Sequence, residues 1–165
     1  MTVSGGALSN GGQLNAAEAL TLELRGALGN TGTLAGQTAT VRAASLDNGG
    51  LLSGRDGLTV TLAGALSNGG RLEGRALGLT ADTLDNGGTL LGMDALTLAI
   101  AGTARNQASG QWLSNGESRL TAAELDNRGT VSGRQVTLTA DTVTQRRHAV
   151  GGRDADGAGA DATGQ

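Results

Sequence analysis

The stretch that decides the fold is Leu46-Asp47-Asn48-Gly49-Gly50, followed by Leu51-Leu52-Ser53-Gly54 and closed by Leu58-Thr59-Val60-Thr61-Leu62. The same order of residue types returns twice, beginning at Leu66 and at Leu84. Aligning the chain on the asparagine of this motif gives one copy every 18 to 21 residues, at Asn10, Asn30, Asn48, Asn68, Asn86, Asn106 and Asn127. Self-similarity at a short period is typical of solenoids, in which each repeat packs only on its neighbours.

The closing segment of each repeat has the alternation of a β-strand. Leu58, Val60 and Leu62 lie two residues apart, and threonine occupies the positions between them. Successive side chains of a strand point to opposite faces, so we expect the leucines and valine inside and the threonines outside. Two further apolar positions, represented by Leu46 and Leu52, complete a set of stacked apolar columns.

The last of these columns alternates large and small residues, in step with the alternation of longer and shorter repeats. Its members are Leu24, Ala43, Leu62, Ala81, Ile100 and Ala122. Large residues beside small ones let neighbouring layers interdigitate, so the full structural period is expected to be two coils.

A repeat of 18 to 21 residues leaves no room for a helix between successive parallel strands. The pattern therefore predicts short strands joined by tight turns, each strand pairing in parallel with its equivalent one coil away. Right-handed winding is the rule for such connections. We expect an all-β fold, a single-stranded right-handed parallel β-helix of about 7 coils over residues 1–143. With coils about 4.8 Å apart, the rod would be roughly 35 Å long.

The asparagines and glycines are interpreted as a stacked corner of this solenoid. Asn-Gly is a turn signal because both residues tolerate positive φ. One asparagine above another is expected to form an amide ladder along the rod. A single glycine-rich turn could cradle a phosphate, but seven stacked copies favour a structural role.

Composition excludes several classes of function. The chain has no cysteine, and therefore no disulfide, thiolate metal site or thiol chemistry. All 12 basic residues are arginine and the net charge is −3, with no basic run and no aromatic stacking platform, so no nucleic-acid partner is expected. No apolar stretch approaches the length of a membrane span. Residues 1–7 do not form a signal peptide, so an export signal of the parent protein is expected upstream.

We predict no catalytic, cofactor-binding or metal-binding residues, and therefore no enzyme. Carboxylates are spread along the repeat, and the one histidine, His148, lies in the tail. In the column after the first leucine, Asp85, Arg105 and Asp126 occupy successive coils, so we expect a surface ladder of alternating charge there. A polysaccharide-degrading β-helix enzyme is kept as the less favoured alternative. Such an enzyme would need clustered acids in a groove, whereas the acids here are spread along the repeat.

Two places depart from the repeat. The unit 104–124 has three residues inserted between Asn106 and Ser118, and it contains Trp112. This tryptophan could sit on an exposed bulge and contact a glycan or a partner, or it could fold back over the leucines of a weakened layer. Residues 144–165 are rich in glycine and aspartate and are expected to be disordered rather than a calcium-binding loop.

The recurring phrase resembles the filamentous haemagglutinin repeat, best at 46–62, 84–100 and 125–140, and the resemblance covers roughly residues 8–143. It implies a stalk segment of a large bacterial two-partner-secretion exoprotein, such as a haemagglutinin adhesin or a contact-dependent growth-inhibition protein. It further implies an outer-membrane partner transporter, a secreted or cell-surface location, and the projection of adhesive or toxin domains. Direct binding of host or neighbouring-cell glycans or receptors by the rod flank is the alternative adhesion function.

Overall fold

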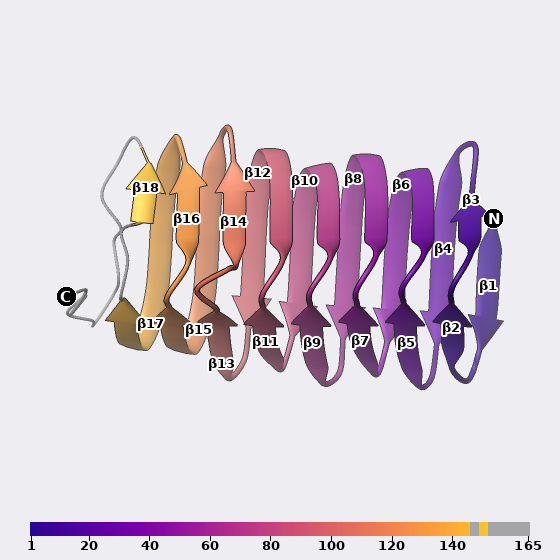
Figure 1. Ribbon diagram of the computed structural model, residues 1–165, viewed down its shortest axis with the longest axis horizontal. Coiled ribbons are helices and arrows are strands. Elements are labelled where there is room, and N and C mark those ends of the chain that lie inside the picture. The colour runs from indigo at the N-terminus through magenta and orange to yellow at the C-terminus, as the bar shows by residue number, and fades with distance from the viewer. Residues whose placement is uncertain (146–148, 152–165) are drawn as a thin grey trace.

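The computed structural model describes residues 1–145 and 149–151, and over these residues the chain is a rod of stacked coils (Figure 1). One parallel sheet of 18 strands winds along the rod, and this part of the chain contains no helix. The strands are β1 (Thr2–Gly5), β2 (Leu8–Asn10), β3 (Gln13–Asn15), β4 (Ala19–Leu24), β5 (Ala27–Asn30), β6 (Thr33–Ala43), β7 (Ser45–Asn48), β8 (Leu51–Leu62), β9 (Ala65–Asn68), β10 (Arg71–Ala81), β11 (Thr83–Asn86), β12 (Thr89–Ile100), β13 (Thr103–Asn106), β14 (Gln111–Ser114), β15 (Glu117–Asn127), β16 (Thr130–Gly133), β17 (Gln135–Gln145) and β18 (Ala149–Gly151).

Each strand pairs in parallel with the equivalent strand of the next coil, as the sequence predicts. The long strands β6, β8, β10 and β12 are successive neighbours, and so are the short strands β5, β7, β9, β11 and β13. The asparagine alignment sets the register, since Asn48 pairs with Asn68 and Asn68 with Asn86. The result is a parallel β-solenoid of about 8 turns. The count exceeds the predicted 7 because β1 and β18 belong to incomplete turns at either end.

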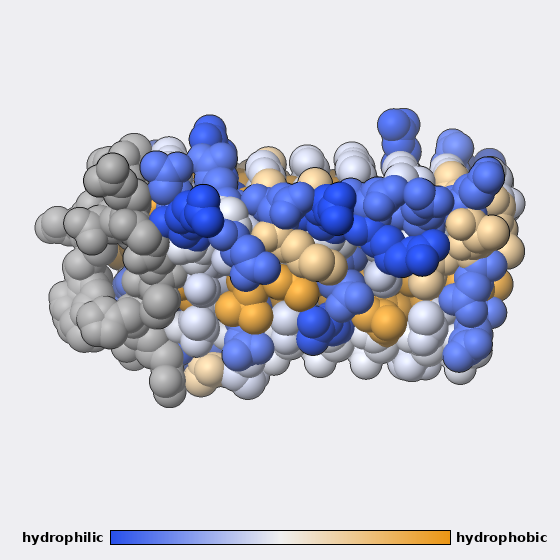
Figure 2. Space-filling model, turned by 90° about the horizontal axis from the view of Figure 1, so that it is seen from above, coloured by the Kyte–Doolittle hydropathy of each residue, from blue (hydrophilic) through white to orange (hydrophobic). Residues whose placement is uncertain are grey.

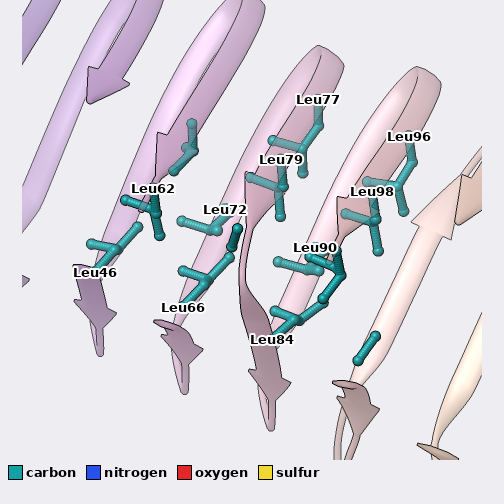
Figure 3. Packing of buried hydrophobic residues seen from close by; sticks show 14 of the residues in the cluster. Leu46, Leu62, Leu66, Leu72, Leu77, Leu79, Leu84, Leu90, Leu96 and Leu98 are labelled. Atoms are coloured by element: carbon teal, nitrogen blue, oxygen red, sulfur yellow. The ribbon is translucent and has the colours of Figure 1, made fainter. Parts of the chain in front are cut away.

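The predicted apolar columns form the core. Within one coil, Leu66 on β9 and Leu72 at the start of β10 point toward Leu77 and Leu79, which lie farther along β10 (Figure 3). Each of these four side chains is fully buried. Burying one leucine contributes about 1.5–3 kcal/mol, as an upper value, so the repeated layers can stabilise a thin rod without an aromatic-rich centre.

The two extra residues of the longer coils are absorbed at two places. The register of paired strands shifts between Gly36 and Thr38 and again between Gly74 and Ala76, so one extra residue lies just before the leucines of the long strand. The other lies in the turn after that strand, where Ala63 and Gly64 separate β8 from β9 and Asp82 alone separates β10 from β11. An extra residue in one strand of a pair makes a bulge, and the corner before the leucines accommodates it without moving the columns.

Strand pairing continues past residue 143, where the sequence puts the end of the β-helix. β17 runs to Gln145, because Val143 is still buried and the strand still has β15 beside it. β18 then pairs with β16, Val131 opposite Ala149. The predictions for His148 and for residues 152–165 lie outside the described residues. No helix in the described chain is long and apolar enough to cross a membrane.

Candidate functional surfaces of the rod

The asparagine corner is a continuous ladder of buried amides. In each step the Nδ2 of one asparagine donates to the Oδ1 of the next, at 2.9 to 3.0 Å. Six such bonds join Asn10, Asn30, Asn48, Asn68, Asn86, Asn106 and Asn127. Every bond runs in the same direction, from the N-terminal coil to the C-terminal one. The amides are thus occupied by each other and offer little to a ligand.

Each ladder amide also ties two backbone segments together. Asn68 Nδ2 lies 3.3 Å from the carbonyl oxygen of Gly70 in its own turn and 3.1 Å from that of Thr89 in the next coil. Asn48 repeats the arrangement with Gly50 and Arg71. Buried polar groups must find partners, and these carbonyl oxygens give the second N–H of each ladder amide its acceptors.

The second glycine of the motif is required for a close approach between coils. A Cβ on Gly50 would collide with the carbonyl oxygen of Gly32, and one on Gly70 with that of Gly50. A Cβ on the first glycine, Gly49 or Gly69, would meet open space. None of the glycines described up to Gly133 has φ in the left-handed region, so the expected explanation from positive φ is wrong for them. The turn needs glycine because backbones touch there.

The sixth coil carries an insertion that folds over the coil before it. Gln107 to Gly110 replace the two turn glycines, and Gln107 Nε2 donates to Asp85 Oδ1 at 2.7 Å. The Ser109 hydroxyl donates to the carbonyl oxygen of Gly87 at 2.8 Å. The insertion is therefore a strap between neighbouring coils, held by the preceding Asn-Gly-Gly turn.

Trp112 is buried, with 1% of its surface exposed. It lies in the second apolar column, between Leu90 and Val131. The expectation of an exposed tryptophan that contacts a glycan or a partner is therefore wrong, and the alternative that it folds back over the core is correct. The asparagine alignment does not show this position, because Trp112 follows Asn106 by six residues whereas Leu90 follows Asn86 by four. The strap contains two of the three inserted residues and accounts for this difference. Aligning on Gly110 instead places it opposite Leu90.

This tryptophan compensates for small residues elsewhere in its coil. Ala104 replaces the leucine of the first column, and the buried Ser118 replaces the leucine at Leu96. Trp112 and Ser118 line a residual cavity of about 10 Å³. Within the described chain, Trp112 Nε1 has no hydrogen-bond partner, which costs stability that its large apolar surface must offset.

We therefore expect Trp112→Leu to lower the free energy of unfolding by about 2 kcal/mol, even though leucine is the usual residue of this column. The triple variant Ala104→Leu, Trp112→Leu, Ser118→Leu should recover most of the loss, because it rebuilds an ordinary layer. Urea unfolding followed by circular dichroism measures both. Ala104→Leu with Ser118→Leu alone is the control and should be overpacked. A single Trp112→Leu variant as stable as the parent would contradict this account of the layer.

The predicted charge ladder forms in part. Arg105 Nε lies 3.6 Å from Asp126 Oδ2, and Arg128 approaches the same carboxylate at 3.3 Å. Asp85 stands in register with Arg105 but accepts its hydrogen bond from Gln107. The strap thus takes the place that Arg105 was expected to fill.

Because the Arg105 side chain is half exposed, Arg105→Ala should destabilise the rod by less than about 1 kcal/mol. The small loss should shrink further as salt is raised, since exposed charges are screened. Thermal melting at low and high salt tests this, with Arg55→Ala as an exposed arginine control. A large loss that salt does not change would assign Arg105 a packing role instead.

The outer face of the long strands carries threonines in register. Thr40 pairs with Thr59, and Thr61 with Thr80. Toward the C-terminal end this face turns charged: Arg119 NH2 donates to Glu117 at 2.7 Å, and that hydrogen bond raises the pKa of the arginine. The threonines on this face thus form pairs in register, with Gly78 and Ala99 at the positions that follow them.

The flank of the rod has an open hollow of about 490 Å³, lined by residues that include Glu23, Arg25 and Arg42. Hydrophilic and hydrophobic residues are interspersed along the side shown in Figure 2. In residues 1–145, no group of three or more His, Asp or Glu side chains is placed to hold a metal ion.

The comparisons with known proteins agree with the repeat. A family model described as haemagglutinin repeat matches residues 2–70, 38–108 and 94–165, three overlapping copies that span nearly the whole chain. No curated protein matches this chain, and no solved structure does. The match covers the coils whose ladder and columns are described above, and the chain belongs to the haemagglutinin repeat family.

Proposed function

We propose that this chain is a stalk segment of a large exported bacterial adhesin, which projects adhesive or toxin domains away from the cell. The observation that carries the proposal is the uninterrupted stacking of equivalent coils. The same ladder bond recurs from Asn10 to Asn127, and the same columns are buried along the rod. Each coil adds the same increment of about 4.8 Å to the length of the rod, so the number of coils sets how far the rod extends from the cell.

Family membership supports the same conclusion. The haemagglutinin repeat family consists of structural adhesins that are secreted or surface-exposed. On this basis the parent protein would be a two-partner-secretion exoprotein, of the haemagglutinin or contact-dependent growth-inhibition type, that crosses the outer membrane with a partner transporter. A stalk requires no cofactor and no reacting group, and catalysis forms no part of the proposal.

The experiment is a blot of size and location. Antibody raised to this chain is used on intact, protease-treated and fractionated source cells. A very large band at the surface or in the medium, trimmed by external protease, is the expected result. A small band confined to the cytoplasm would overturn the stalk proposal.

A second candidate is adhesion by the flank itself, and the exposed threonines favour it. Thr59 and Thr61 are exposed, and each lies beside one threonine of an adjacent coil, Thr40 and Thr80 respectively. Such hydroxyls could donate to and accept from glycan hydroxyl groups. A glycan array tests it: a ligand bound by the parent rod and lost in Thr59→Val with Thr61→Val would support it. These substitutions keep the strand and remove only the hydroxyls; binding that survives them excludes the threonine face.

A further inference from the structure

Five asparagines of the rod are followed directly by glycine. Four of them belong to the ladder, namely Asn10, Asn48, Asn68 and Asn86, and the fifth, Asn115, lies outside it. An asparagine followed by glycine is chemically labile, because the small residue lets its backbone nitrogen reach the asparagine side chain. The structure separates the pairs sharply. Asn48, Asn68 and Asn86 are almost completely buried, whereas Asn115 is exposed.

The ladder blocks both reacting groups. The side-chain amide of Asn68 accepts from Asn48 and donates to Asn86, each at 2.9 Å, so its carbonyl carbon cannot swing toward the chain. The nucleophile, the backbone nitrogen of Gly69, donates to the carbonyl oxygen of Asn48 in the previous coil at 2.8 Å. Reaction at a ladder asparagine would require the two coils to separate.

The Asn115 corner lacks these constraints. The backbone nitrogen of Asn115 is bound to the carbonyl oxygen of Met93 at 3.0 Å, but its exposed side chain lies outside the ladder. The backbone nitrogen of Gly116 donates only to the hydroxyl of its near neighbour Ser114, at 3.0 Å, so it is free of any bond to another coil. The Gly116 carbonyl oxygen still accepts from Arg134 N of the next coil at 2.6 Å, but neither the attacking nitrogen nor the Asn115 amide has to break a bond between coils in order to react.

We propose that Asn115 is a site of spontaneous deamidation, and that the folded rod protects the ladder asparagines from the same reaction. The Gly116 backbone nitrogen gives its proton to solvent base and attacks Cγ of Asn115. The new C–N bond closes a succinimide ring, the Cγ–Nδ2 bond breaks, and the nitrogen leaves as ammonia with a proton from solvent. Water then opens the ring to aspartate or isoaspartate.

The product changes a crowded corner. A new carboxylate appears one coil from Asp94, which already pairs with Arg75 at 3.5 Å. Isoaspartate also adds a methylene to the backbone beside Gly116, where even a Cβ would collide with the carbonyl oxygen of Asp94. Formation of isoaspartate therefore loosens the corner of the sixth coil while leaving the asparagine ladder intact, whereas the aspartate product keeps the backbone as it is.

The test is to incubate the folded rod at mildly alkaline pH in heavy-oxygen water and to quantify the products at each asparagine by peptide mass spectrometry. Incorporated heavy oxygen distinguishes the reaction from artefacts of digestion. Asn115 should convert at least about tenfold faster than Asn48, Asn68 or Asn86, since each ladder amide must first break two hydrogen bonds. In urea, where the ladder is lost, all four should convert at similar rates.

Two outcomes would overturn the proposal. One is conversion of the ladder asparagines in the folded rod as fast as Asn115. The other is protection of Asn115 in the folded rod as strong as that of the ladder. The variant Asn115→Gln, whose longer side chain would have to form a larger ring, is the matched control and should remove the product without changing the unfolding midpoint.

Discussion

Replacing Asn68 with aspartate should lower the free energy of unfolding at neutral pH by about 3–5 kcal/mol, the cost typical of an uncompensated buried charge. The aspartate can still accept from Asn48, but it would face Asn86 Oδ1, which now accepts from the Asn68 amide at 2.9 Å. Two acceptors would then oppose each other in the dry interior of the corner. A desolvated carboxylate with Asn48 as its donor on one side and no donor on the other is expected there, and the ladder would be cut in two.

The loss should depend on pH, with a sign that follows from the ladder. Desolvation and the facing acceptor would raise the pKa of the introduced carboxyl above its unfolded value of about 3.9. A raised folded pKa means that stability is retained below the unfolded pKa and is lost as pH rises through the folded pKa. At low pH the protonated acid can donate to Asn86 and restore the ladder. Urea unfolding across this range measures the effect.

The matched control is Asn115→Asp, which makes the same chemical change at an exposed corner. It should shift the free energy of unfolding by less than about 0.5 kcal/mol, as most surface substitutions do. Equal losses for Asn68→Asp and Asn115→Asp, or a loss at Asn68 that pH does not alter, would mean that the ladder contributes little to stability.

Gly70→Ala should cost about 3 kcal/mol, because the added methyl would be forced against the backbone of the previous coil. The obstacle is the carbonyl group of Gly50, which accepts from Arg71 N at 2.8 Å and cannot turn aside as a side chain would. The coils would have to separate locally, and Asn68 would lose the geometry of its bonds. Thermal or urea unfolding gives the magnitude.

The neighbouring glycine offers a strict comparison. Gly69→Ala adds the same methyl in open space, and should be neutral or stabilising by about 0.5 kcal/mol, since alanine restricts the unfolded chain. Thr31 and Arg128 occupy the equivalent position in other coils. If the Gly69 and Gly70 variants were equally destabilised, close packing of backbones would not be the reason for the second glycine.

Sequence reasoning could predict the columns and the register because each rests on many repeats of one local rule. Leu46, Leu66 and Leu84 stack as aligned, and the asparagines above one another form the ladder. Leucine and threonine alternate along the long strands, so only one face of each strand can point into the core. A shift of the register by one residue would have buried the threonines. With register settled, the parallel β-solenoid followed.

The features that sequence could not predict depend on contacts between particular atoms. The position of Trp112 required knowing that the strap at Gln107 adds its residues before the strand. The role of the second glycine required the distance between two backbones, although one signal was available: Thr31, Gln107 and Arg128 appear at the first glycine position and never at the second. The hydrogen bond from Gln107 to Asp85 depends on the path of the strap, which the alignment of columns does not show.

The two-coil alternation of large and small residues in the last column has a genetic consequence. Because each coil contacts only its neighbours, an in-frame duplication or deletion of one two-coil unit returns every column, glycine and asparagine to the same environment. A change of a single coil would instead place small beside small, as Ala122 and Ala140 already are near the irregular coil. Unequal recombination in such a gene can therefore change the number of coils in steps of two without disturbing the core. Selection can then act on the length of the rod without a loss of stability that other mutations would have to compensate.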